Sequence, residues 1–168
     1  EYTLVTVADY VLKHTPGNTV SNLSSTRALR DVTRKYGCEY NASAVGEVNV
    51  VTKMKATHAV IGGEGNGGVI YPESHYGRDA LVGIALFLSH LAHEGKKVSE
   101  LRATYPPDFM AKSRSDLTAE TYVDAILAKI KELYKDEEIN DIDGVKIDFP
   151  DKWVHLRKSN TEPIIRVY

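Results

Sequence analysis

Gly62-Gly63-Glu64-Gly65-Asn66-Gly67-Gly68 is the stretch from which the fold and the site can be worked out. It follows the short apolar run 58–61, which we expect to form a buried strand, and it precedes a second β-like run at 69–71. Glycine has no Cβ, so a segment this rich in glycine can turn sharply and let a ligand approach the backbone. The sequence therefore predicts a tight loop between two strands.

Two polar side chains stand at alternate positions of this loop. The carboxylate of Glu64 can accept hydrogen bonds from hydroxyl groups, and the carboxamide of Asn66 can both donate and accept them. This pattern suits a polyhydroxylated ligand, although a simple glycine-rich turn would have a similar composition. A nucleotide loop is disfavoured, because no helix opens directly after the glycines and no Lys-Ser or Lys-Thr pair follows them.

Composition narrows the class of protein. The 168 residues fit one large domain or two small ones, and 42% hydrophobic residues is ordinary for a soluble globular protein. A net charge of −2 gives no electrostatic reason to expect binding to nucleic acid or to an anionic membrane. No apolar run approaches the roughly 18 residues that a membrane span needs.

The cysteine content and the first residues bear on the compartment. The single cysteine, Cys38, rules out an internal disulfide and favours a reducing compartment, so we expect a cytoplasmic location. The opening residues Glu1-Tyr2-Thr3-Leu4 carry no methionine and no basic segment, so they do not resemble a signal peptide. We expect the sequence to begin inside a longer polypeptide.

Hydrophobic periodicity predicts two domains. Helical and strand-like segments alternate up to residue 105, which is typical of a layered α/β/α domain with a parallel or mixed sheet. Residues 80–88 are apolar almost all round, so we expect a helix buried between layers. Pro106-Pro107 marks the boundary, giving domains at 1–105 and 106–168.

The second domain has a different pattern. Residues 109–117 are extended and polar, and 118–121 can cap a helix that continues to Tyr134. Three short strand-like runs follow, so we expect a small α+β domain with an antiparallel sheet. The expected strands are 145–149, 153–157 and 164–168, and the expected buried stripe of the helix is Tyr122, Ala125, Ile126, Ile130, Leu133 and Tyr134.

Arg157-Lys158-Ser159-Asn160-Thr161-Glu162-Pro163 joins the last two of these strands. Arg157 can bind a phosphate through two hydrogen bonds, and short polar side chains with backbone N–H groups can bind the remaining oxygens. Lys158 would point away from Arg157 if both belong to a strand. A polar hairpin loop is the alternative. One loop that suits hydroxyls and one that suits phosphate would together serve a sugar phosphate in an interdomain cleft.

These motifs resemble the α-D-phosphohexomutases. The glycine loop, followed by Gly77-Arg78-Asp79 and an apolar helix, is similar to that family's sugar-binding loop and next helix. Asp143-Gly144-Val145-Lys146-Ile147, Trp153 and the 157–163 segment resemble its last domain. The resemblance covers essentially the whole chain, in the same order.

The resemblance implies a sugar-phosphate site without a catalytic residue in this chain. In that family, a phosphoserine in the first domain and magnesium in the second act on a substrate that the third and fourth domains hold. This chain matches only the last two, so it would be the C-terminal half of an enzyme that interconverts hexose 1-phosphate and 6-phosphate, inactive without its N-terminal domains. Many members have a serine where Asn66 stands and a histidine where Glu47 stands. The implied contacts are Glu64 and Asn66 to sugar hydroxyls, and Arg157, Ser159, Asn160 and Thr161 to phosphate.

Two alternatives and several residues stay open at this point. A non-catalytic sugar-phosphate-binding module, or a purely structural pair of domains, would carry the same loops, and the hexose could be glucose, mannose or glucosamine. His90 and His93 are expected on a helix surface rather than at a metal. Glu47 fits a helix N-terminus, and Arg78 fits a loop or cap position that could also reach the ligand.

Overall fold

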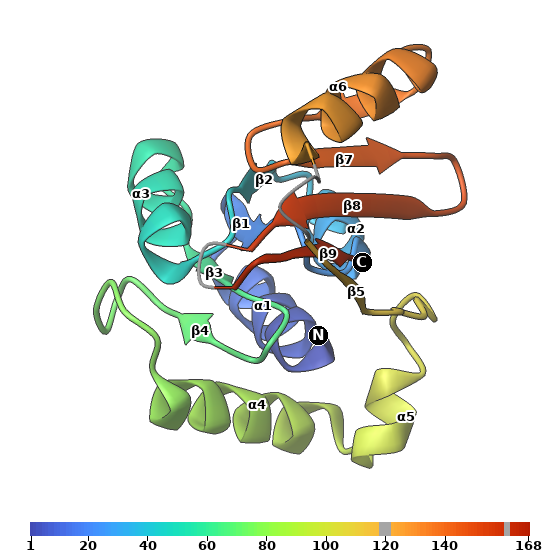
Figure 1. Ribbon diagram of the computed structural model, residues 1–168. Coiled ribbons are helices and arrows are strands. Elements are labelled where there is room, and N and C mark those ends of the chain that lie inside the picture. Colours follow the sequence, from blue (N-terminus) through green and yellow to red (C-terminus); the bar gives the residue numbers. More distant parts are fainter. Residues whose placement is uncertain (118–121, 160–161) are drawn as a thin grey trace. The chain divides into compact units, whose positions relative to one another are not determined.

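The chain forms two compact units, Glu1–Phe109 and Met110–Tyr168, in the computed structural model. The structure describes residues 1–117, 122–159 and 162–168. Each unit has its own sheet (Figure 1). No helix within these described ranges is both long enough and apolar enough to cross a membrane.

The proline pair is held by the first unit. The hydroxyl of Tyr2 donates to the Pro106 carbonyl at 2.6 Å, and the Asp108 backbone N–H donates back to that hydroxyl at 2.9 Å. Thr26 also donates to the Asp108 carboxylate at 2.5 Å. These contacts explain why the first unit extends to Phe109, whereas the sequence predicts a boundary after Tyr105.

Helices and strands alternate through residue 63 of the first unit, as the periodicity predicts. Its sheet has the order β2-β1-β3-β4, in which β1 runs parallel to β2 and β3, and β4 runs antiparallel to β3. The predicted mixed sheet is therefore confirmed. The elements are α1 (Tyr2–His14), β1 (Thr19–Asn22), α2 (Ala28–Lys35), β2 (Tyr40–Ser43), α3 (Glu47–Thr57), β3 (Ile61–Gly63), β4 (Val69–Ile70), α4 (Ala80–Glu94) and α5 (Val98–Arg102).

The apolar side chains of this sheet separate into two cores. Successive side chains of a strand point to opposite faces, and accordingly Val69 belongs to one cluster and Ile70 to the other. The larger cluster contains the apolar residues of α1 and α2, and the smaller contains Val50 and Met54 of α3. Helices thus cover both faces of the sheet, which confirms the layered α/β/α arrangement.

The third strand lies later in the sequence than predicted. His58 ends α3 in the left-handed conformation, with φ of 51°, so the predicted strand at 58–61 is wrong at its start. The strand occupies Ile61–Gly63 and includes two of the loop glycines. A Cβ at Gly62 would lie 2.8 Å from the Val20 carbonyl oxygen and 2.6 Å from the Met54 sulfur, so only glycine allows this close packing.

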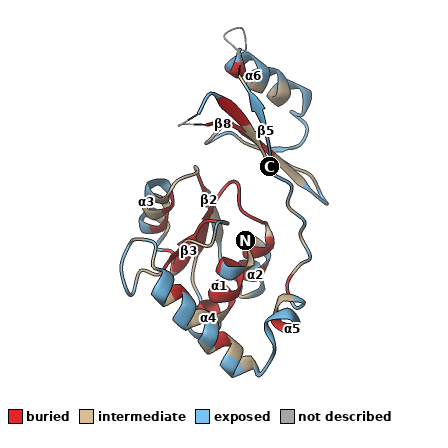
Figure 2. Ribbon diagram, turned by 60° about the horizontal axis from the view of Figure 1, so that its bottom comes forward, coloured by how far each residue is buried: buried red, intermediate tan, exposed pale blue. Residues whose placement is uncertain are grey.

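The prediction that residues 80–88 are buried between layers is wrong. Leu81, Ile84 and Leu88 of α4 are 79%, 55% and 57% exposed, and Figure 2 shows exposed positions along this helix. One side of α4 packs against α1, while its only buried residues are Gly83 and His90. The unit therefore packs against one side of the helix only, and no described residue covers the other side.

An antiparallel sheet of five strands forms the second unit together with one helix. The strand order is β5-β9-β8-β7-β6, and every pairing is antiparallel, as predicted. The strand β6 was not predicted, because its charged flank resembles a solvated helix end. The elements are β5 (Ser113–Asp116), α6 (Val123–Leu133), β6 (Glu138–Asn140), β7 (Val145–Asp148), β8 (Trp153–Lys158) and β9 (Ile164–Val167).

The predicted buried stripe of α6 is wrong. Tyr122 is 77% exposed and Leu133 is 67% exposed, and Val123 is the only buried residue of the helix. The helix contacts β7, whose Val145 and Ile147 are buried. The small sheet covers only part of the apolar surface of this three-turn helix. The capping segment predicted at 118–121 lies outside the described residues.

Candidate functional site

The glycine loop starts at the carboxyl end of β3, where two other strands also end. β1, which ends at Asn22, and β2, which leads to Gly46, run in the same direction as β3. In open α/β sheets, ligands bind at the carboxyl ends of parallel strands. The topology therefore brings Asn22, Gly46 and Glu64 to one edge of the sheet.

Glu64 is buried and fixed at this edge. Only 6% of the residue is exposed, and its Oε1 accepts hydrogen bonds from Asn22 Nδ2 at 2.7 Å and from the Gly46 backbone N–H at 3.2 Å. Its Oε2 lies 4.0 Å from Nη1 of Arg78. A buried charge requires such partners, because leaving water costs several kcal/mol otherwise. One carboxylate oxygen is thus held by the protein, and the other faces a cation.

The loop backbone closes tightly around this residue. The Glu64 N–H donates to the Gly68 carbonyl at 3.0 Å, and the Gly67 N–H donates to the Glu64 carbonyl at 3.0 Å. Gly63 has φ of +156°, and a Cβ there would lie 2.0 Å from the Gly68 oxygen. Glycine is therefore required at position 63 by the loop geometry itself.

Asn66, the second predicted sugar contact, is exposed on this loop. Its Oδ1 accepts a hydrogen bond from the Gly68 backbone N–H at 2.9 Å. The side chain thus forms a local turn of the kind that asparagine favours. Its Nδ2 group supplies the two N–H donors that this hydrogen bond does not use.

Glu47 and Arg78 form an ion pair beside the loop. Arg78 donates to the Glu47 carboxylate from Nε at 2.7 Å and from its backbone N–H at 3.0 Å. These bonds, the backbone one first, lower the pKa of Glu47 below its usual value. A Cβ at Gly68 would lie 2.6 Å from Cδ of Arg78, so the arginine side chain lies across that glycine. The sequence shows these residues only as a helix start and a loop residue. In the structure, the pair links α3 to the glycine loop.

Asn22 and Ser25 were not predicted as site residues. Ser25 Oγ donates to Asn22 Oδ1 at 2.8 Å and accepts from the Gly65 backbone N–H at 2.9 Å. A chain of hydrogen bonds therefore runs from Gly65 through both side chains to the Glu64 carboxylate. The position of Asn22 at the end of a parallel strand is the signal that could have identified it.

Arg157, the main predicted phosphate contact, lies in β8 and is 5% exposed. Its Nε donates to Oδ2 of Asp143 at 2.9 Å, which orients the guanidinium group. Gly144, with φ of +77°, lets the turn at Asp143 lie close to β8. A Cβ at this position would lie 2.2 Å from the Leu156 carbonyl oxygen. Asp143 is thus a positioning residue that sequence reasoning missed.

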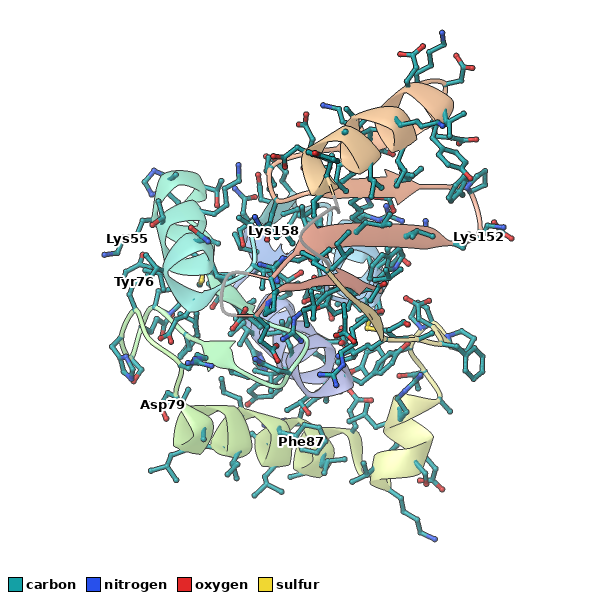
Figure 3. The ribbon with its side chains drawn as sticks, viewed as in Figure 1. Lys55, Tyr76, Asp79, Phe87, Lys152 and Lys158 are labelled. Carbon is teal, nitrogen blue, oxygen red and sulfur yellow. The ribbon has the colours of Figure 1, made fainter. Side chains whose placement is uncertain are left out.

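The following loop is only partly described. Ser159 is buried, and its backbone N–H donates to the Ile164 carbonyl at 2.9 Å. The predicted contacts Asn160 and Thr161 lie outside the described residues. Beyond them, Glu162 forms an ion pair with Arg166 of β9. Lys158, which is labelled in Figure 3, is exposed. It points to the face opposite Arg157 because side chains alternate along a strand.

Three arginines are direct neighbours across the second sheet. Arg114 of β5 is opposite Arg166, which in turn is opposite Arg157. Directly opposed residues of antiparallel strands share a face, and like charges there repel one another. Two of the three also have a carboxylate partner, because Arg157 pairs with Asp143 and Arg166 pairs with Glu162. Anion binding on the Arg157 face stays a prediction.

A histidine beside Arg157 is completely buried. His155 Nε2 lies 2.6 Å from the Asp143 carbonyl oxygen, and its ring stacks on Tyr168. Burial lowers the pKa of His155, so the imidazole is neutral at neutral pH. The residue therefore supports the Asp143 turn without adding charge to it.

His90, predicted at a helix surface, is instead 1% exposed. Its Nε2 lies 3.1 Å from the Tyr105 hydroxyl and 3.4 Å from Oδ2 of Asp9. Burial lowers the pKa of His90. His90 is buried because this side of α4 packs against α1. Within the described ranges, no group of three or more His, Cys, Asp or Glu side chains could hold a metal ion.

Comparison with known proteins identifies both units. Residues 1–109 match the family model "Phosphoglucomutase/phosphomannomutase, alpha/beta/alpha domain III", and residues 112–168 match "Phosphoglucomutase/phosphomannomutase, C-terminal domain". A phosphoglucomutase/phosphomannomutase of Thermococcus kodakarensis is 36% identical over 99% of this chain and 37% of the relative. A phosphoglucosamine/phosphogalactosamine mutase of Sulfurisphaera tokodaii is 37% identical over 88% of this chain and 33% of the relative.

Solved structures agree with the sequence matches. A phosphoglucomutase/phosphomannomutase family protein from Burkholderia thailandensis superposes with a TM-score of 0.79 at 25% identity, over 98% of this chain and 36% of that protein. The chain thus spans about a third of the length of these relatives. It belongs to the phosphoglucomutase/phosphomannomutase family, of which it contains the third and C-terminal domains.

Proposed function

We propose that this chain supplies the hydroxyl-binding and phosphate-binding parts of a phosphohexomutase, which moves a phosphoryl group between the 1 and 6 positions of a hexose. The observation that carries the proposal is the buried Glu64 carboxylate, held by Asn22 and Gly46 on a loop whose backbone only glycine allows. The relatives named above are all hexose- or hexosamine-phosphate mutases.

In the first unit, Glu64 would bind sugar hydroxyls. Oε1 is already occupied by two N–H donors, so Oε2 is the oxygen that accepts from a hydroxyl. Because the acceptor is fixed before the sugar arrives, little side-chain entropy is lost on binding. Asn66 would contribute the donors of its Nδ2 group from the exposed part of the loop. A buried acceptor beside exposed donors offers a sugar ring both kinds of hydrogen-bonding partner.

In the second unit, Arg157 would bind the substrate phosphate. Its Nε is committed to Asp143, and the remaining guanidinium donors are available for a phosphate in the bidentate geometry that arginine favours. We propose that Ser159, Asn160 and Thr161 complete the site. Each charge-assisted hydrogen bond contributes about 1.5–3 kcal/mol.

We assign the nucleophile and the metal to other domains. Phosphoryl transfer needs positioned oxygens and charge stabilisation, and this chain would provide the positioning. We propose that the phosphorylated serine and the magnesium ion belong to domains that precede these two in the full-length enzyme. The 168-residue chain alone is then expected to bind sugar phosphate and to show no mutase turnover.

A titration of the chain with glucose 6-phosphate, followed by backbone NMR, tests the proposal. If a complete site gives about −7 kcal/mol, half of the contacts leave a Kd in the millimolar range. Shifts are expected at residues 157–163 and at Glu64, and inorganic phosphate alone should reproduce only the first group. Arg157→Lys retains the charge but loses the forked geometry, so it is expected to weaken binding about tenfold or more.

Lys158→Ala is the matched control, because this neighbouring cation is exposed on the opposite face. It should leave the shifts unchanged. The proposal is wrong if neither loop responds at tens of millimolar ligand while the spectrum shows a folded chain. It is also wrong if Lys158→Ala abolishes the shifts and Arg157→Lys does not.

A further inference from the structure

Asn66 is followed directly by a glycine in the loop between β3 and β4 (Figure 1). It is the only exposed residue of 61–70, and Asn66-Gly67 is the only Asn-Gly pair in the sequence. An asparagine before glycine can close a ring, because the backbone nitrogen of the next residue attacks the side-chain carbonyl carbon when no Cβ blocks its approach. The position therefore combines a reactive pair with access to water.

Gly67 leaves room for this attack. Its φ is +100°, and a Cβ built there would meet no atom within 4 Å, so neighbouring groups do not crowd the position. The Gly67 N–H donates to the Glu64 carbonyl at 3.0 Å, and this hydrogen bond must open before the nitrogen reacts. Backbone hydrogen bonds in exposed loops open at a smaller free-energy cost than those of core strands.

A second hydrogen bond polarises the carbonyl that is attacked. Asn66 Oδ1 accepts from the Gly68 N–H at 2.9 Å. When a nitrogen adds to Cγ, negative charge builds up on Oδ1, and a fixed N–H donor stabilises that charge as in an oxyanion hole. Among the described residues, none hydrogen-bonds the Nδ2 group of Asn66, so no protein contact retains the nitrogen that must leave.

We propose that Asn66 is a site of spontaneous deamidation through ring closure with Gly67. The Gly67 nitrogen bonds to Cγ of Asn66 and passes its proton through solvent to the departing Nδ2 group, so the Cγ–Nδ2 bond breaks and ammonia leaves. Water then opens the resulting succinimide. Cleavage between the ring nitrogen and Cγ gives aspartate, and cleavage between that nitrogen and the main-chain carbonyl carbon gives isoaspartate. The net reaction consumes one water and releases one ammonia.

The consequence for ligand binding rests on the function proposed above. Either product replaces the Nδ2 donors with carboxylate oxygens, which only accept hydrogen bonds. The new charge arises two residues from the buried Glu64 carboxylate. Aspartate can still accept from the Gly68 N–H, so the turn would remain, whereas isoaspartate lengthens the main chain by one carbon and would break this turn. Deamidation would therefore remove the donors that Asn66 is proposed to offer a sugar.

Peptide mapping by mass spectrometry tests the chemistry. The 168-residue chain is incubated at 37 °C and at pH 7, 8 and 9. The peptide containing Asn66 is expected to gain about 1 Da and to separate into aspartate and isoaspartate forms. The rate should rise by up to about tenfold per pH unit, because the backbone nitrogen reacts in its deprotonated form.

The chain offers an internal control and a matched variant. Asn49 is also exposed, but Val50 follows it and donates its N–H to the Gly46 carbonyl, so the Asn49 peptide should keep its mass. Asn66→Gln keeps the carboxamide but requires a larger ring that closes more slowly, so it should also keep its mass. The proposal is overturned if the Asn66 peptide gains no mass over several weeks at pH 9. It is also overturned if Asn66→Gln or Asn49 is modified as fast.

The effect on binding is scored separately with Asn66→Asp, which is a uniform form of one product. In the NMR titration with glucose 6-phosphate, the shift at Glu64 is expected to need about fivefold more ligand, because a hydrogen bond to the sugar is lost. Inorganic phosphate should shift Arg157 as in the parent chain. Mass gain at Asn66 with unchanged binding by Asn66→Asp supports deamidation and counts against the proposed sugar contact. Weaker binding by Asn66→Asp without any mass gain in the parent chain does the reverse.

Discussion

Replacing Asn22 with alanine removes the donor of the 2.7 Å hydrogen bond to the Glu64 carboxylate. The carboxylate remains buried, and the Gly46 N–H at 3.2 Å becomes its nearest hydrogen-bond donor among those described. Ser25 Oγ also loses the acceptor that it contacts at 2.8 Å. The substitution therefore leaves a charge and a hydroxyl short of partners at the same point of the sheet edge.

The size of the effect follows from these contacts. A hydrogen bond to a charged group contributes about 1.5–3 kcal/mol, and a neutral one about 1 kcal/mol. We therefore expect the free energy of unfolding of the first unit to fall by about 2–4 kcal/mol. For a unit of this size, each kcal/mol lowers Tm by roughly 4 °C, so the expected decrease is about 8–16 °C.

Asn22→Asp gives a second, pH-dependent measurement. It puts a new carboxyl group within hydrogen-bond distance of the buried Glu64 carboxylate, and repulsion raises the pKa of the introduced group above its value in the unfolded chain. The folded state then binds more protons than the unfolded state at mildly acidic pH. The variant should be less stable than Asn22→Ala at pH 7 and should regain stability as the pH falls toward 5.

Thermal melts followed by circular dichroism measure both variants. Asn41→Ala is the control, because Asn41 Nδ2 on the neighbouring strand is buried without a hydrogen-bond partner among the described atoms, so its loss should cost little or raise Tm. The reasoning is refuted if Asn22→Ala melts within about 2 °C of the parent while Asn41→Ala melts much lower.

Two other substitutions and a pH series test the remaining geometry. Gly63→Ala should prevent folding or cost more than about 3 kcal/mol in urea unfolding, because its Cβ would meet the Gly68 oxygen at 2.0 Å. Gly37→Ala, at φ of +70° in open space, should cost only about 1 kcal/mol, and equal losses would contradict this account. Burial holds the pKa of His90 and His155 below the usual 6.5, so the unfolded chain binds protons first and stability should fall as the pH drops below about 6.5. His155→Gln should flatten this slope in melts between pH 7.5 and 5.5, and a slope that does not change would count against the assignment.

Local patterns predicted the order of elements well. The two kinds of sheet follow from periodicity, because helical and alternating patterns depend on neighbouring residues alone. The errors arose where packing against a distant segment determines the bounds or the exposure of an element. The start of β3 depends on how closely Gly62 approaches β1, and the exposure of α4 and α6 depends on how much surface each sheet offers.

The site was predicted in part for the same reason. Glu64 and Arg157 stand out by residue type within their own motifs. Their partners do not, because they come from distant positions: Asn22 is 42 residues from Glu64, Glu47 is 31 from Arg78, and Asp143 is 14 from Arg157. Motifs in the sequence identify the side chains that would contact a ligand, whereas the strand order is needed to identify the partners that hold those side chains in place.

The edges of the second sheet have a consequence for self-association. Among the described residues, β5 and β6 are the outer strands, and an outer strand offers unpaired backbone groups to any other chain. Both strands are short and polar, with the sequences Ser-Arg-Ser-Asp and Glu-Ile-Asn, and all four residues of β5 are exposed. Charged side chains at Arg114 and Asp116 discourage a second sheet from adding there. Exchanging both for valine would turn this edge into a template for fibril growth, while leaving the core of the unit as it is.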